Sequence, residues 1–559
     1  MTIITSKYRS DTARLFMDDI IQNDYYLFIS STENTRVLNT HFSKNEFLEK
    51  TLFGKRIDQE EIFFMVKNNP WQINTIYTQY DDREDLSGKK YYAVVYPENN
   101  ETDDYKVYKC LFNNYGSQSI SPPNYSITQP DQIYQLADGY IWKFLYSISV
   151  LDFEKYNAMG YIPLPQSSNN AIIEETSSID QIFVENANEN RGYETVVGTI
   201  EQVDTFTVNT GTDLAPIIET FVGNITIAAP SGAFNQIAEY YAGYSIYITN
   251  SNDVSELYTI DSYSYNNITG NAVIRLRGSV NLDPALIGES TYQIIPRIEI
   301  RGDGIGARAI PIVSETGNIT TVRVLNRGSG YTNATAVIPD PFGFDPSSLN
   351  SLDERVTLRP ILSPIGGHGS NLADELGSKS ILLYVTFNEF DNEIIPASNS
   401  FASVGIVKNP TFKSLTPPPV FDNRIQLELE EHSLSINETI TQIETDPAES
   451  IFNELRFSGK VHEIVNNNIF VSEYMGPYPN TQTAVSNTEI SSDVSLKIDL
   501  PLFSSQNQIL IINTNNENYA GFTLSPYVQR TGEVYYMNRF FPITRTEDSR
   551  EQFKIIFEF

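Results

Sequence analysis

Cysteine and histidine are both scarce in this sequence of 559 residues, which contains a single cysteine and four histidines. One cysteine cannot form a disulfide within the chain, so its stability must come from packing. Cys110 lies in the run VYKCLF, where we expect a small buried thiol. The histidines are His41, His368, His432 and His462. Their wide separation argues against a shared metal site, and we predict neither a metal nor a cofactor.

Long apolar runs are also missing. No stretch of about twenty apolar residues occurs, and the first residues, MTIITSKYRSDTARLF, lack an apolar segment behind basic residues. The sequence therefore predicts neither a membrane-spanning helix nor a signal peptide.

Basic residues are few relative to acidic ones. Lys and Arg total 38 against 70 Asp and Glu, which gives a formal net charge of -32. Such a chain repels nucleic-acid phosphates and anionic lipid surfaces, so we expect neither as a partner. Solubility is the simplest explanation of this acidity, and a partner with basic patches is a second explanation that charge alone leaves open.

The familiar catalytic motifs are absent. His462-Glu463 would begin a zinc-protease motif, but Asn466 stands where the second histidine is needed. No Gly-x-Ser-x-Gly elbow occurs, and the lysines that follow glycine lack the other residues of a P-loop. The glycines of RGDGIGARA (301–309) have the wrong spacing for a dinucleotide fingerprint and indicate a turn between strands. We therefore predict no catalytic residue and no enzymatic activity.

Two weaker candidates for chemistry deserve comparison with simpler explanations. His368 in GGHG has the chemistry of a ligand or a base, but its flanking glycines are more typical of a tight loop. Asp81, Asp82, Glu84 and Asp85 form the densest acidic group, and paired carboxylates can hydrolyse a glycosidic bond. That group is polar throughout and lacks the glycine of a calcium loop, so we expect a solvated loop.

The residues that are abundant favour strands. Hydrophobic residues make up 40% of the chain, with 34 Tyr and 31 Phe, and the length suggests several domains. Two helices are expected near the start. The first begins with Ser10 as N-cap, and its apolar positions are Ala13, Phe16, Met17, Ile20 and Ile21. The second covers 43–55, with Phe47, Leu48, Leu52 and Phe53 on one face.

Aromatic and β-branched runs predict the strands. In the first part they are YYLFIS (25–30), YYAVVY (91–96), KVYKCLF (106–112) and YIWKFLYSI (140–148). Asp138-Gly139 before the last of these indicates a hairpin turn. Later runs are YSIYITNS (244–251), AVIRLRG (272–278), YQIIPRIEIRG (292–302), ILLYVTF (381–387), FASVGIVKNP (401–410) and the alternating RIQLELE (424–430).

We therefore expect a predominantly β, multidomain protein, in which both chain ends form a mixed α+β core and all-β modules of the sandwich or barrel type are inserted. The expected segments are a core at 1–165, inserted β modules at 166–364, a continuation of the core at 365–419, a second β module at 420–529, and C-terminal strands at 530–559 that return to the core. Lys554–Phe559 is expected to complete a sheet near the start of the chain.

Several stretches, taken in order, carry a family resemblance. They are ITSKYR (4–9), NNPWQINTIYTQYDD (68–82), VYKCL (107–111), ADGYIWKFLYSIS (137–149) with the later YIPLP, GGHGSNLADELG (366–377), VKNP (407–410), and GEVYYMNRFFPITRTEDSREQFKIIFEF (532–559). In this arrangement the chain resembles the baseplate wedge subunits encoded by gene eight of T-even-type contractile-tail phages (myoviruses), in particular their longer marine-phage relatives. The resemblance covers about half of the chain.

The resemblance implies a structural protein of the virion, located in the tail baseplate after assembly in the host cytoplasm. It implies a homodimer that also joins other wedge subunits and transmits rearrangement when the tail contracts, with no catalysis. A second hypothesis is that the inserted, aromatic-rich β modules bind or depolymerise host-surface glycans, because aromatic rings stack on sugars.

Overall fold

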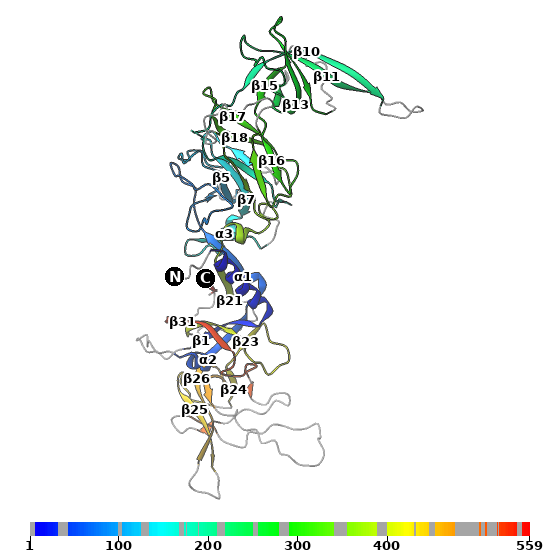
Figure 1. Cartoon of the computed structure of the whole chain (residues 1–559). Helices are drawn as coiled ribbons and strands as arrows, with labels where there is room; N and C mark the ends of the chain where they lie inside the picture. The colour runs from blue at the N-terminus through cyan, green and yellow to red at the C-terminus, as the bar shows by residue number, and fades with distance from the viewer. Residues whose placement is uncertain are drawn as a thin grey trace. The chain divides into compact units, whose positions relative to one another are not determined.

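A computed structural model describes residues 6–31, 43–98, 103–123, 133–166, 173–174, 176–187, 189–209, 218–249, 255–278, 290–339, 355–387, 400–429, 432–445, 453–475, 502–504, 509–510, 522–523, 525–544 and 550–559 (Figure 1). Strands make up 50% and helices 9%, so the expectation of a predominantly β protein is confirmed. The chain divides into two compact units. Unit 1 comprises 1–67, 154–166 and 378–559, and unit 2 comprises 68–153 and 167–377, so the chain passes between them four times.

Unit 1 contains two sheets that combine strands from both ends of the chain. The first has the order β23-β2-β1-β22-β31, and the second has the order β32-β21-β3-β8. The strands of the first are β1 Tyr25–Ser30, β2 Thr51–Arg56, β22 Ser400–Lys408, β23 Val420–Asp422 and β31 Glu533–Thr544. Those of the second are β3 Ile62–Lys67, β8 Tyr161–Pro163, β21 Ser380–Phe387 and β32 Glu551–Glu558. The described neighbouring strands pair antiparallel.

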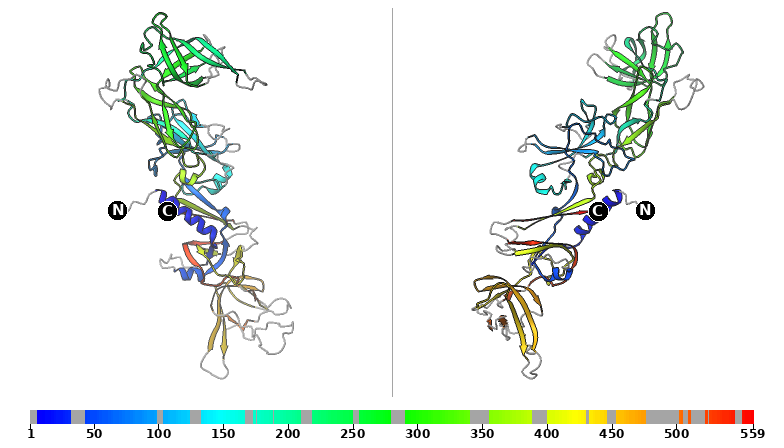
Figure 2. Two further views of the ribbon diagram at one scale, coloured as in Figure 1. Left: turned by 45° about the vertical axis from the view of Figure 1, so that its right-hand side comes forward. Right: turned by 90° about the vertical axis from the view of Figure 1, so that its left-hand side faces the viewer.

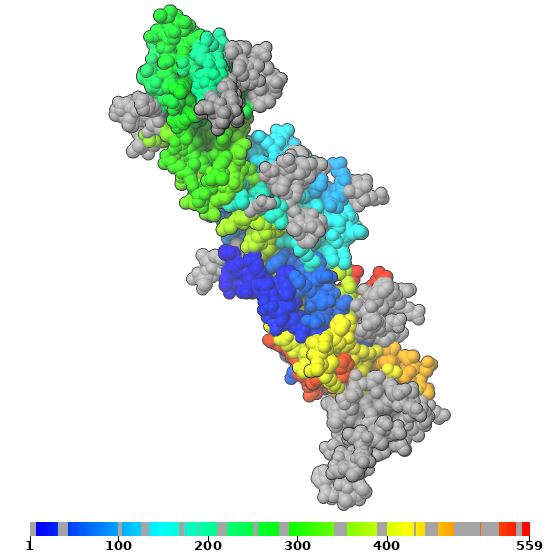
Figure 3. All heavy atoms as spheres, turned by 90° about the vertical axis from the view of Figure 1, so that its right-hand side faces the viewer, coloured from blue at the N-terminus to red at the C-terminus, as the bar shows by residue number. Residues whose placement is uncertain are grey.

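Helix α1 (Ser6–Gln22) packs its apolar face on these sheets, while its other face is exposed (Figures 2 and 3). Ala13, Phe16 and Ile20 of the helix are buried in one core with apolar residues of β1, β21 and β22. The final strand β32 pairs with β21, which in turn pairs with β3. The expected core formed by both chain ends, completed by the last strand, is therefore confirmed.

The two expected helices differ from the structure in their bounds. Helix α1 begins at Ser6, so the prediction of Ser10 as its N-cap is wrong, and Ser10 lies buried inside the helix. The second helix, α2, spans only Lys44–Glu49, with Ser43 as N-cap in a capping box with Glu46. The remaining residues form β2, because pairing with β1 and β23 satisfies their backbone groups and buries Leu52 and Phe53.

A third sheet of unit 1 belongs to the second expected β module. Its order is β29-β28-β25-β26-β27-β24-β30. The strands are β24 Ile425–Glu428, β25 Thr439–Thr445, β26 Asn453–Val465, β27 Asn468–Met475, β28 Leu502–Ser504, β29 Ile509–Leu510 and β30 Phe522–Thr523. The alternation predicted for RIQLELE is confirmed, since Ile425 and Leu427 are buried and the residues after each are half-buried.

In unit 2, the predicted strand runs YYAVVY, KVYKCLF and YIWKFLYSI belong to the antiparallel sheet β4-β5-β7-β6. Its strands are β4 Tyr92–Val95, β5 Tyr105–Phe112, β6 Ile133–Gln135 and β7 Ile141–Ile148. Cys110 is buried, as expected. Asp138-Gly139 turns the chain between β6 and β7, and Gly139 has φ 82°, which a residue with a Cβ rarely adopts.

The inserted segment of unit 2 contains a closed barrel with the order β10-β11-β14-β13-β12-β15. Its strands are β10 Val196–Asn209, β11 Ile218–Ala228, β12 Ser245–Thr249, β13 Ser255–Tyr265, β14 Ala272–Leu276 and β15 Thr291–Ile295. Isoleucines and tyrosines from these strands fill its interior. An expected barrel-like module is therefore present.

The rest of this segment forms a four-stranded sheet and a hairpin. The sheet has the order β16-β19-β20-β9, and the hairpin is β17-β18. The strands are β9 Ile179–Val184, β16 Glu299–Gly302, β17 Arg308–Val313, β18 Ile319–Asn326, β19 Ala334–Val337 and β20 Leu358–Leu362. The glycines at 302, 304 and 306 lie where β16 turns toward β17, as predicted.

The division into units differs from the expected segments at two places. Residues 68–153 belong with the inserted segment rather than with the N-terminal core, and unit 2 extends through Gly377. Buried ion pairs between these segments, described below, account for the difference.

The remaining short helices are η1 (Gln59–Glu61), α3 (Val150–Tyr156) and α4 (Leu372–Glu375). Among the described residues, no helix combines the length and apolar character needed to cross a membrane.

Candidate functional site: a buried charge cluster

Two buried lysines lie directly opposite each other in the first sheet of unit 2. Lys109 on β5 is the register partner of Lys143 on β7, and both side chains are almost inaccessible to solvent. Like charges at opposing positions destabilise a sheet, and a buried charge needs an opposite charge beside it. Carboxylates must therefore approach this face of the sheet.

The glycine-rich loop after β20 brings one carboxylate to this face. Gly366, Gly367 and Gly369 all have φ above 80°, which lets the chain fold tightly around His368. A Cβ on Gly367 would lie 2.5 Å from the Cβ of Glu174, so a larger residue there would push the two segments apart. The predicted tight loop is thus confirmed, and it leads into helix α4, whose last residue is Glu375.

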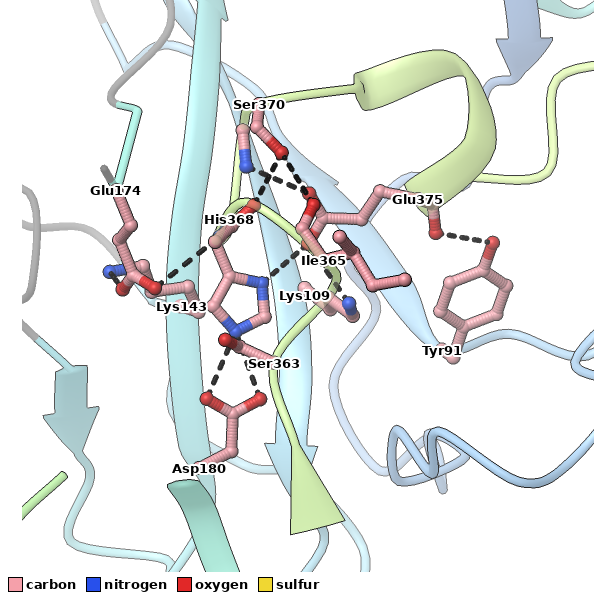
Figure 4. Close-up of polar contacts among 12 residues, drawn as sticks. Tyr91, Lys109, Lys143, Glu174, Asp180, Ser363, Ile365, His368, Ser370 and Glu375 are labelled. Atoms are coloured by element: carbon pink, nitrogen blue, oxygen red, sulfur yellow. Dashed lines mark hydrogen bonds and ion pairs between the residues drawn. The ribbon is translucent and has the colours of Figure 1, made fainter. Parts of the chain in front are cut away.

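His368 is completely buried between two carboxylates (Figure 4). Its Nδ1 lies 2.5 Å from Oε1 of Glu375, and its Nε2 lies 2.9 Å from Oδ2 of Asp180 on β9. Because ionised carboxylates only accept hydrogen bonds, both ring nitrogens must donate, and the ring is an imidazolium. Glu375 also accepts a hydrogen bond from Nζ of Lys109 at 2.9 Å.

The second half of the cluster is centred on Glu174. Its Oε1 accepts hydrogen bonds from Nζ of Lys143 at 2.5 Å and from a guanidinium nitrogen of Arg327 at 2.6 Å. Arg327 also pairs with Asp180, which connects the two halves. We call these seven residues the buried charge cluster: Lys109, Lys143, Glu174, Asp180, Arg327, His368 and Glu375.

Several pKa values in the cluster shift in the directions that these contacts require, while burial lowers the pKa of Lys143 in spite of Glu174. Burial opposes the charge on Glu375, but Lys109 and His368 outweigh it and hold the pKa of Glu375 at about 2. Burial likewise disfavours charged His368, yet Asp180 and Glu375 raise its pKa above the ordinary value. The pKa of Asp180 is lowered by His368 and Arg327 in spite of its burial. Three carboxylates therefore face four cations.

The face of an aromatic ring compensates part of the additional positive charge. Nζ of Lys109 lies 3.3 Å from the centre of the Tyr80 ring, and the same ring makes an edge contact with His368. A desolvated cation over a ring gains about 2 kcal/mol. Tyr80 lies within NNPWQINTIYTQYDD, so the loop before β4 also packs on the cluster.

The arrangement is that of a clamp rather than a reactive centre. Each charged group in it is engaged by an opposite charge. The groups come from β5, β7, the segment before β9, β9 itself, the residue after β18, the loop before α4, and α4. Within the described part of the chain, no three His, Cys, Asp or Glu side chains are placed to hold a metal ion. Lysine and arginine side chains already bind the carboxylate oxygens with which a metal ion would be coordinated. The cluster therefore ties the first sheet of unit 2 to the inserted segment.

The acidic loop at 81–85 is exposed to solvent, as predicted, except at Asp81. Asp82, Glu84 and Asp85 are exposed, but Asp81 is buried, and its Oδ2 lies 2.7 Å from a guanidinium nitrogen of Arg359 on β20. Asp81 also accepts a hydrogen bond from the backbone N–H of Arg83 at 3.0 Å. Asp81 is thus a second ionic tie between the same two segments of unit 2.

The other histidines lie apart from the cluster. Nε2 of His432 lies 2.9 Å from the carbonyl oxygen of Asn466, and His462 lies on β26 of the third sheet in unit 1. Burial and the nearby Arg424 lower the pKa of His462 to about 4. His41 lies outside the described residues.

The sequence pattern drew attention to His368 but not to its partners Glu375 and Asp180. A usable signal was present in both lysine-containing strands. Lys109 and Lys143 each interrupt a run of apolar and aromatic residues that is too long to have a solvated face. A lysine in such a run requires a buried carboxylate.

Comparison with known proteins gave no further assignment. No protein-family model matches the chain, and no curated protein matches it either.

Proposed function

We propose that this chain is a structural subunit of the baseplate wedge of a contractile phage tail, and that it assembles with itself and with other wedge subunits. The ordered stretches that resemble the gene-eight family motivate this assignment. The described architecture supports a structural role. Buried ion pairs, and antiparallel sheets that combine strands from both ends of the chain, join segments that are far apart in the sequence.

One observation carries the proposal: the stretches with the resemblance come together in two places. In unit 1, the helix that begins within ITSKYR packs on β31 and β32, which are formed by the C-terminal stretch. In unit 2, VYKCL supplies Lys109, ADGYIWKFLYSIS supplies Lys143, and GGHGSNLADELG supplies His368 and Glu375.

The glycan-binding alternative for the inserted modules has less support from the described residues. A sugar-stacking platform needs exposed rings. In the barrel, Tyr241, Tyr244, Tyr263 and Tyr292 are buried in its core, so these four rings serve packing.

Sedimentation of mixtures tests the proposal. The purified chain would be combined with each wedge subunit encoded in the same phage genome and examined by analytical ultracentrifugation. We expect a faster-sedimenting complex with at least one of them, and a dimer when the chain is alone. A chain that sediments independently of every wedge subunit would refute the proposal.

Mass spectrometry of mature particles provides an independent test. We expect the chain to be present in purified virions in a fixed ratio to the other baseplate proteins. Its absence from virions, or turnover of a bacterial surface polysaccharide by the purified chain, would contradict a structural role.

A further inference from the structure

Acidic residues outnumber basic ones on the barrel of unit 2, whose strands carry one basic residue, the exposed Arg275 of β14. Arg277 follows this strand and pairs with Asp261. Between Gly192 and Ile274 the sequence contains nine Asp and Glu residues and no Lys, Arg or His. Among the described residues of the barrel strands, Glu201, Asp204, Glu256 and Asp261 are exposed. The exterior of the barrel is therefore anionic over most of its strands, which favours a cationic partner.

Two strands of the barrel continue past it as a two-stranded ribbon. β10 pairs with β15 only through Val196–Thr199, and β11 pairs with β14 only through Asn224–Ile227. Residues 205–209 and 218–222 are then paired only with each other among the described strands, and Figure 1 and the left view of Figure 2 show them extending away from the barrel. We call these two segments the β10–β11 ribbon.

The ribbon presents apolar side chains to solvent. Phe206 is 46% exposed and Val208 is 40% exposed, and alternation along the strand places both on one face. Phe221 lies directly opposite Phe206, with ring centroids 5.9 Å apart. An isolated two-stranded ribbon is only marginally stable in water, so a ribbon with an exposed aromatic pair gains stability when a partner covers that face.

We propose that the β10–β11 ribbon is a docking element for a basic surface on a different protein. An apolar recess in that surface receives Phe206 and Val208, and lysine or arginine residues around the recess pair with Glu201 and Asp204 at the base of the ribbon. A second copy of this chain, with its net charge of -32, does not offer the basic surface that this ribbon requires, so self-association uses another surface. Anionic lipids and nucleic acids do not offer a basic surface either. The inference does not depend on the wedge assignment.

The test uses the full chain and a short fluorescent peptide in which lysine and leucine alternate. Binding is followed by fluorescence anisotropy at several salt concentrations. We expect the peptide to bind and the combined Phe206→Ser, Val208→Ser variant to bind it about tenfold more weakly or worse, which corresponds to about 1.4 kcal/mol. Glu201→Gln with Asp204→Asn is expected to weaken binding and reduce its salt dependence.

Ile268→Ser is the matched control, because Ile268 is 95% exposed in the turn between β13 and β14 of the same barrel. This variant is expected to bind like the unaltered chain. Thermal unfolding followed by circular dichroism checks that the ribbon variants keep the barrel folded, since their substitutions lie beyond the barrel pairing.

Four results would overturn the proposal. They are no binding of the lysine–leucine peptide, equal binding of a glutamate–leucine peptide, equal loss in the Ile268→Ser variant, or binding that the ribbon substitutions leave unchanged. A further arm with neutral oligosaccharides separates the glycan alternative. Sugar binding that Phe206→Ser abolishes would assign the ribbon to glycans instead.

Discussion

The ring of Phe16, on helix α1, lies 5.1 Å from the ring of Phe557 on the last strand, measured between centroids. Phe16 also contacts Phe559 and Tyr535 of the C-terminal strands and Tyr25 of β1. One buried side chain therefore joins the beginning of the described chain to its end. The packing of unit 1 therefore depends on residues that are far apart in the sequence.

Replacing Phe16 by alanine is expected to destabilise unit 1. Phe16 is only 6% exposed, and removing a buried aromatic ring costs about 3–5 kcal/mol. Leu15→Ala on the same helix is the control, since Leu15 is 69% exposed and the change should stay within about 0.5 kcal/mol. Urea unfolding followed by fluorescence measures both. Equal effects of the two substitutions would show that α1 does not pack on the C-terminal strands.

Lys109→Met is expected to destabilise unit 2 by about 3–5 kcal/mol, because it leaves Glu375 buried with one cation fewer. Lys89→Met is the control. Lys89 pairs with Glu84 at the surface, where an ion pair contributes about 0–1 kcal/mol. The free energy of unfolding in urea distinguishes the two variants. A Lys109→Met protein as stable as the Lys89→Met protein would argue against a clamp.

The stability of unit 2 is expected to decline at alkaline pH. The pKa of His368 is higher in the folded state than in the unfolded state, because Asp180 and Glu375 outweigh burial. The stabilisation is therefore fully present below the unfolded pKa of about 6.5 and is lost as the pH rises through the raised folded pKa. Lys109 and the ring of Tyr80 also face this group.

Urea midpoints measured at a series of pH values test this expectation. His368→Gln should be less stable at pH 6 and should lose the alkaline decline, while His432→Gln should retain it. At acidic pH the sign is opposite. Glu375 has a pKa of about 2 in the folded state, so its contribution is lost as the pH falls from about 4 toward 2. An alkaline decline that persists in His368→Gln would assign it to another group.

Gly198→Ala is expected to disturb the barrel where β10 pairs with β15. A Cβ at Gly198 on β10 would lie 1.8 Å from the carbonyl oxygen of Ala228, so the backbone must move. Overpacking of this kind costs about 1–3 kcal/mol or more. Gly223→Ala on β11 is the control, because its nearest atom would be 3.3 Å away. Similar thermal unfolding of the two variants would contradict this reading of the barrel.

Much of the fold could be predicted from the sequence where local patterns and tertiary pairing agree. YIWKFLYSI and KVYKCLF formed neighbouring strands because aromatic and β-branched residues suit a sheet buried on both faces. The helix expected at 43–55 was correct only for its first half. Thr51–Arg56 has apolar residues at helical spacing, but its backbone hydrogen bonds are made with β1 and β23 on either side. Local periodicity does not report such pairing.

The charge cluster shows why the site was harder to predict than the strands. Glu174, Asp180 and Arg327 lie in the segment that we interpreted as an insertion, while Lys109 and Lys143 lie in the expected core. Ion pairing between distant segments leaves no mark at a fixed spacing in the sequence. The same contacts explain why residues 68–153 belong to unit 2.

The chain passes between its two units at four separate points, near residues 67, 153, 166 and 377. A protease that cuts at any one of these points leaves the halves covalently joined through the other three. Separating the two units by proteolysis therefore requires four cuts, whereas a single cut suffices for two domains joined by one linker.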